Sequence, residues 1–221
     1  MGNRECSLEV FRKDVASHEM TIAMDSGVYR HLRFAKPGTG CYHFDIVTWP
    51  GHLAISGDMG SSVFTRLHDM FEFFRAGPET TERRGGLYIN AGYWAEKCIA
   101  NDGEKTEFRK ELFADAVKRR FDNHFEGMEL SASQKASKSE LWSSLEDTVL
   151  SCADDGHHEA VRAAMDFEGD AGSFARFNLH DFYEESVTDY TFHFIWRLYA
   201  IAHAVQTYDV AKAAQPEPAH G

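Results

Sequence analysis

A six-residue pattern that could bind a metal ion occurs twice in the chain. The sequences LHDMFE and LHDFYE each place a glutamate four positions after a histidine. On a helix this spacing puts both side chains on one face, and histidine with carboxylate is a ligand set that suits a metal. The candidate ligands are His68, Glu72, His180 and Glu184. The same spacing arises by chance in a chain with 12 histidines and 35 acidic residues, so we favour two solvated helix faces and expect no metal or other cofactor.

A second set of polar residues is predicted to share one face of a sheet. His31 and Arg33 alternate with apolar residues, and His43 and Asp45 do the same on a following segment. Alternation with a period of two directs such side chains away from the core. Two imidazoles, a guanidinium and a carboxylate could serve acid–base chemistry or bind an anion. Antiparallel sheets commonly expose one polar face, and we favour that simpler interpretation.

The strongest chemical signal is a concentration of negative charge. Between Ser144 and Tyr190 there are twelve acidic residues and two basic ones, which accounts for most of the formal net charge of −12. Such a surface attracts a basic partner. The alternative is that acidic helix faces only keep the protein soluble. The residues predicted to bind a partner form three clusters: Asp154 and Asp155, Glu168 and Asp170, and Glu184 and Glu185.

Several function classes lack support in the sequence. Neither a nucleophile elbow, a P-loop nor a dinucleotide-binding glycine pattern is present. The four cysteines form no CxxC pair, which is typical of reduced thiols in the cytoplasm. The acidic balance disfavours direct binding of nucleic acid or of a membrane surface. We therefore favour a binding protein over an enzyme.

The elements that must position these residues are predicted from periodicity and turn chemistry. Turn-forming residues divide the stretch 19–58 into short segments, which predicts an antiparallel meander of three or four strands. If Pro50-Gly51 forms the central turn of a hairpin, Ile46 pairs with Ile55 and all apolar residues share one face. This register is self-consistent.

The rest of the chain is predicted to be mainly helical. Ser61 or Ser62 could cap a helix that ends near Arg75, and the serine-rich stretch 131–139 is predicted to be a polar connection. The apolar stretch 192–204 is well short of the roughly 20 residues of a membrane span, so we expect a buried helix. Residues 1–212 should form a single α+β domain with about six helices in all. We expect the sheet at about 19–58, the helical part at about 61–212, and a disordered tail over 213–221.

Several segments are similar to a family of uncharacterised phage and prophage proteins. They are YRHLRF at 29–34, YHFDIVTWPGHLAISGDMG at 42–60, FTRLHDMFEFFR at 64–75 and INAGYWAEK at 89–97. A later run, FIWRLYAI at 194–201, also resembles it. The resemblance implies no activity and no catalytic residue. It implies an accessory gene of a mobile element, and many such genes encode inhibitors of host defence nucleases and their guide complexes.

Together these observations favour a phage-encoded accessory protein that acts in the cytoplasm of the host bacterium. Its expected partner is a basic host protein or nucleoprotein complex, and an anti-CRISPR-like inhibitor is one form of this hypothesis. One alternative is a small metal-dependent or acid–base hydrolase that uses the His/Asp/Glu sets. Another is a structural or assembly factor of the phage particle.

Overall fold

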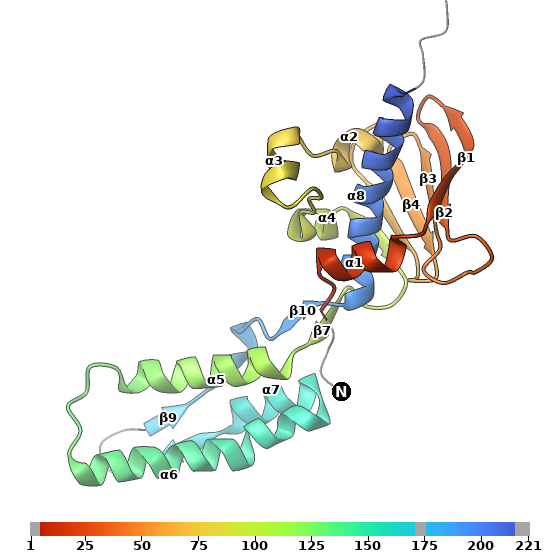
Figure 1. Cartoon of the computed structure of the whole chain (residues 1–221). Coiled ribbons are helices and arrows are strands. Elements are labelled where there is room, and N and C mark those ends of the chain that lie inside the picture. The colour runs from red at the N-terminus through yellow and green to blue at the C-terminus, as the bar shows by residue number, and fades with distance from the viewer. Residues whose placement is uncertain (1–4, 171–175, 215–221) are drawn as a thin grey trace, which may run out of the picture. The chain divides into compact units, whose positions relative to one another are not determined.

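The chain folds as two compact units in the computed structural model, which describes residues 5–170 and 176–214 (Figure 1). The first unit comprises residues 1–105 and 190–221, and the second comprises residues 106–189. The second unit is therefore inserted into the sequence of the first.

A six-stranded antiparallel sheet organises the first unit. Its strands follow one another in sequence order, β1 (Glu19–Ser26), β2 (Tyr29–Ala35), β3 (Phe44–Trp49), β4 (His52–Gly57), β5 (Ser62–Thr65) and β6 (Cys98–Asn101). The predicted α+β class and the N-terminal meander are confirmed. The predicted register is confirmed too, since Ile46 faces Ile55 and Trp49 faces His52 across the β3–β4 hairpin. Gly51 has φ +78°, which suits the second central position of a type II turn after Pro50.

The long helix α8 (Phe192–Ala213) packs on the apolar face of this sheet (Figure 1). Alternate residues of β2 and β3, including Leu32, Phe34 and Phe44, are buried against α8 residues such as Trp196 and Ile201. Four shorter helices contribute further to this unit: α1 (Leu8–Val15), α2 (Met70–Phe74), α3 (Pro78–Arg83) and α4 (Ala91–Glu96). The predicted buried helix is confirmed, and no helix of the described ranges is long and apolar enough to span a bilayer.

A buried arginine of α8 fixes the turn that follows β4. Arg197 is 2% exposed and donates to the carbonyl oxygen of Met59 at 2.8 Å and to Asn101 Oδ1 at 3.0 Å. Gly60 lies against this guanidinium with φ +84°, and a Cβ at that position would come within 2.4 Å of Arg197 Nη1. The glycine is therefore required both by its backbone conformation and by the close approach of Arg197.

The second unit is mostly helical. It contains β7 (Thr106–Phe108), α5 (Lys110–Phe125), α6 (Ala132–Thr148), a 3₁₀ helix (Leu150–Asp155), α7 (His157–Asp166), a hairpin of β8 (Glu168–Asp170) and β9 (Arg176–Asn178), and a second 3₁₀ helix (Phe182–Glu184). Strand β7 pairs with β10 (Thr188–Tyr190), where the chain passes back to the first unit. Aromatic side chains dominate the core of this unit, among them Phe113, Phe121, Phe125, Phe177 and Phe182.

Two predicted elements are wrong. The helix expected to run from Ser61 or Ser62 to Arg75 is instead strand β5 followed by the short helix α2. Phe64 points into the core from a strand in which burial alternates, so its helical spacing with later phenylalanines misled the prediction. The polar connection expected at 131–139 is the start of α6, because Ser131 and Gln134 form a capping box there.

The expected counts and boundaries also change. The sheet has six strands where three or four were predicted, and the described residues contain eight α-helices where about six were predicted. Strands β5 and β6 lie beyond the predicted limit of 19–58. At the C-terminus Ala213 still belongs to α8, and residues 215–221 of the predicted tail lie outside the described residues.

Candidate functional site

Three of the four predicted sheet-face residues form one cluster on the more exposed face of the first unit's sheet. Arg33 and Asp45 are direct neighbours across β2 and β3. Asp45 accepts from Arg33 Nη1 at 2.8 Å through one oxygen and lies 2.8 Å from His31 Nε2 through the other. His43 is not part of the cluster, because it precedes β3 and its Nδ1 lies 2.6 Å from the carbonyl oxygen of Gly40.

The chemistry open to this cluster is limited by its own pairing. The Asp45 side chain is only 15% exposed and both of its oxygens are engaged by neighbours. Because both carboxylate oxygens already bond to His31 and Arg33, Asp45 has little room to contact a substrate. The arrangement fits cross-strand stabilisation of an open sheet face.

The two helix faces considered as candidate metal sites are not formed, so the favoured interpretation of them as solvated helix faces is wrong as well. His68 lies in a bend before α2, which begins at Met70, and His180 lies in a turn before the 3₁₀ helix that contains Glu184. The helical spacing that would join each histidine to its glutamate is therefore absent. Within residues 5–170 and 176–214 no group of three or more His, Cys, Asp or Glu side chains is arranged to hold a metal ion.

Asp69, inside the first copy of that repeated pattern, has a structural role instead. Its carboxylate caps α2 by accepting from the backbone N–H of Phe71 and accepts two hydrogen bonds from Arg30, at 2.9 and 2.8 Å. Arg30 also lies 4.5 Å from the centre of the Phe71 ring. Burial alone would raise the pKa of Asp69, but the hydrogen bonds from Arg30 and Phe71 outweigh it and lower the pKa.

The negative charge of the chain belongs almost entirely to the second unit. Residues 106–189 contain 19 acidic and nine basic side chains, a formal net charge of −10 out of −12. The basic side chains of α5 do not neutralise this surface evenly. Lys110 pairs with Asp154, and Arg119 and Arg120 both bind Glu185.

The six predicted partner-binding residues therefore separate into different groups. Asp155 and Glu184 are exposed and make no ion pair with a described residue, whereas Asp154 is exposed but paired. Glu168 is exposed, and its Oε1 lies 3.7 Å from His180 Nε2. Glu185 is only 15% exposed, and its carboxylate binds two arginines of α5 within the second unit. The side chain of Asp170 lies outside the described residues.

Further acidic residues stand where helix electrostatics disfavours them. Glu146 and Asp147 are exposed in the last turn of α6, and Asp166 is the last residue of α7. Neither helix has a basic residue in its last turn. A negative charge at a helix C-terminus opposes the macrodipole, at a cost of about 0.3–1 kcal/mol each. In α7 this cost is offset in part, because Asp166 lies 3.8 Å from Arg162 Nη1. Glu146 and Asp147 make no ion pair with a described residue, so the stability of α6 does not explain their placement.

We define the acidic end of α6 as Glu146, Asp147, Asp154 and Asp155. The four residues lie within ten positions, at the end of α6 and along the 3₁₀ helix that follows it. Both elements are held by the core of the second unit through Leu145, Val149 and Ala153. The anchoring gives the carboxylates a defined backbone. In the sequence, Glu146 and Asp147 were noticed only as two of the twelve acidic residues between Ser144 and Tyr190. The structure adds that α6 ends at Thr148, so that both carboxylates oppose the dipole of this helix.

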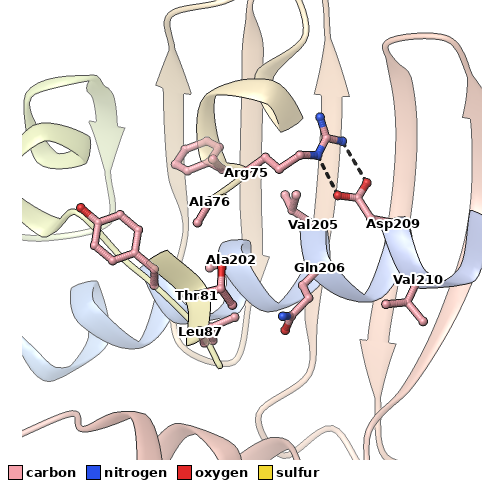
Figure 2. Close-up of a pocket in the computed structure, with 11 residues that line it drawn as sticks. Arg75, Ala76, Thr81, Leu87, Ala202, Val205, Gln206, Asp209 and Val210 are labelled. Carbon is pink, nitrogen blue, oxygen red and sulfur yellow. Dashed lines mark hydrogen bonds and ion pairs between the residues drawn. The ribbon is translucent and has the colours of Figure 1, made fainter. Parts of the chain in front are cut away.

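A small groove with a polar rim lies beside α8 in the first unit (Figure 2). Its volume is about 140 Å³, and its polar rim includes Arg75 and Asp209. Two hydrogen bonds of 2.7 and 2.9 Å join these side chains and are drawn as dashed lines in Figure 2. The hydrogen bond to Asp209 raises the pKa of Arg75 above its usual value. Arg75 and Asp209 already bond to each other, and the volume of the groove would hold only a few atoms. We therefore do not assign a ligand to this groove.

Comparisons with known proteins identify no relative: no family model, curated protein or solved structure matches the chain.

Proposed function

We propose that this protein is a binding protein whose second unit engages a basic surface on another protein. The observation that carries this proposal is the acidic end of α6. Four exposed carboxylates are concentrated there, in a unit with a formal net charge of −10, although the dipole of α6 disfavours two of them, Glu146 and Asp147. A favourable interaction with a cationic partner would offset that local cost.

The partner that suits this surface is a groove lined by lysine and arginine. Such grooves hold nucleic acids through their phosphates, and carboxylates on successive helical turns can occupy the same positions. The resemblance of several segments to phage and prophage proteins supports a bacterial host protein as the partner. We propose an inhibitor of a nucleic-acid-targeting host defence complex, acting in the host cytoplasm.

The test combines identification of the partner with a matched pair of variants. Affinity capture from bacterial lysate and mass spectrometry supply candidates, which are then purified. The variant Asp147→Lys/Asp155→Lys reverses two exposed charges in the second unit. The control Glu79→Lys/Glu82→Lys reverses two exposed charges on α3 of the first unit and gives the same net charge.

The expected result is that the first variant weakens binding at least tenfold while the control changes it less than threefold. Wild-type association should slow as salt rises, because exposed charges are screened beyond about 8 Å at physiological ionic strength. A short single-stranded DNA should compete with the protein for its partner. Equal binding by both variants, or a partner with no cationic groove, would contradict the proposal.

A further inference from the structure

A larger cavity lies in the first unit, on the side of α8 that contacts α1. It has a volume of about 400 Å³, within the range of pockets that hold small molecules. Phe11, Val15 and Phe34 form buried apolar walls. Leu87 and Gln206, which Figure 2 shows beside the smaller groove, also line this cavity.

One polar side chain in the cavity is left without a hydrogen-bond partner. Both ring nitrogens of His18 are buried, and neither bonds to any described residue. A neutral imidazole has one donor and one acceptor, and leaving such groups unsatisfied costs about 1–3 kcal/mol each. Folded proteins rarely tolerate this, so the unpaired nitrogens of His18 mark a place for a polar partner, either an ordered water or a polar group of a ligand.

The other polar side chains that line the cavity indicate which charge a ligand should carry. Arg12 donates through Nη2 to the carbonyl oxygen of Gly85 at 2.6 Å, and a guanidinium has further donors. His203 packs edge-on against Phe11, and burial lowers its pKa, with the charges of His18 and Arg12 adding to the effect. Of the described residues that line the cavity none is acidic, although the chain as a whole has a net charge of −12. Arg12 is thus a single fixed positive charge beside an apolar space.

We propose that this cavity binds a small monocarboxylate with an apolar aromatic or aliphatic body. The apolar body lies against Phe11, Val15 and Phe34. The carboxylate accepts hydrogen bonds from Arg12, and from His18 once the imidazole ring turns toward the ligand. A monoanion matches the one fixed cation, whereas a phosphate would bring more charge and more bound water than the cavity can neutralise. This site is independent of the acidic end of α6 and of the partner proposed for it.

The site is tested by calorimetric titration with three carboxylates, 4-phenylbutyrate, octanoate and indole-3-acetate. The neutral analogue 4-phenylbutanol measures the contribution of the charge. At least one carboxylate should bind with a dissociation constant below about 1 mM, and 4-phenylbutyrate should bind at least tenfold more tightly than 4-phenylbutanol. If no carboxylate binds at 10 mM, or if the alcohol binds as tightly as the acid, the proposal is wrong.

Three variants locate the binding in this cavity. Arg12→Gln should weaken 4-phenylbutyrate binding about tenfold and leave 4-phenylbutanol binding unchanged. Lys13→Gln is the matched control, because it removes an exposed positive charge from the next position of α1, outside the cavity lining. His18→Leu should weaken carboxylate binding yet keep or raise the melting temperature of the ligand-free protein, since it removes the unsatisfied nitrogens. Unchanged affinity in both Arg12→Gln and His18→Leu would overturn the assignment.

Discussion

Glu185→Gln tests whether a residue predicted to bind a partner instead holds the second unit together. Glu185 Oε1 accepts from Arg120 Nε at 2.5 Å, and Oε2 accepts from Arg119. The Glu185 side chain is 15% exposed, whereas those of Arg120 and Arg119 are 35% and 56% exposed. These bonds attach the segment after the second 3₁₀ helix to α5.

The magnitude follows from the two charged hydrogen bonds. Each contributes about 1.5–3 kcal/mol when its partners are sheltered, and solvent screening at the exposed Arg119 reduces its share. Glutamine retains one acceptor but removes the charge. We therefore expect Glu185→Gln to lower the free energy of unfolding by about 1–3 kcal/mol, measured by urea denaturation at pH 7.

The effect should depend on pH in a defined direction. Burial alone would raise the pKa of Glu185, but the hydrogen bonds from Arg120 and Arg119 outweigh it and lower the pKa in the folded protein. The stabilisation is thus complete above the unfolded-state pKa of about 4.3 and is lost as the pH falls through the lower folded-state value. The difference between wild type and Glu185→Gln should shrink over that acidic window.

Glu184→Gln is the matched control, because Glu184 is exposed and makes no ion pair with a described residue. Its free energy of unfolding should stay within about 0.5 kcal/mol of the wild type. Similar losses in the two variants, or a loss below about 0.5 kcal/mol for Glu185→Gln, would refute the assignment of Glu185 to the fold.

Three other changes test the first unit. Ile55→Ala should cost about 2–5 kcal/mol in urea denaturation, because the side chain is 1% exposed and pairs with Ile46; a loss below about 0.5 kcal/mol would contradict this packing. Gly60→Ala should cost at least about 1 kcal/mol more than Gly27→Ala, since both glycines have positive φ but only Gly60 lies against Arg197; equal losses would count against that contact. Phe194→Asp should abolish cooperative thermal unfolding by burying an unpaired charge in α8, and a normal melting transition would show that this position is not in the core.

The sequence by itself determined the features that depend on local pattern. The β3–β4 hairpin follows from strict alternation around Pro50-Gly51, which allows one register that puts all apolar residues on the same side. The position of α8 follows from its continuous apolar run, which needs burial on nearly all sides. The acidic character of residues 106–189 is a matter of composition and needs no structure.

Only the tertiary structure decided features that depend on contacts between distant residues. Phe64 has a spacing that suits a helix, but pairing of its strand with β4 and with the distant β6 makes it part of the sheet. Glu184 and Glu185 are adjacent and chemically alike, yet only Glu185 reaches the arginines of α5. His18 and His203 meet in one cavity because α1 packs on α8. Periodicity describes the faces of one element, whereas these outcomes depend on which other element covers each face.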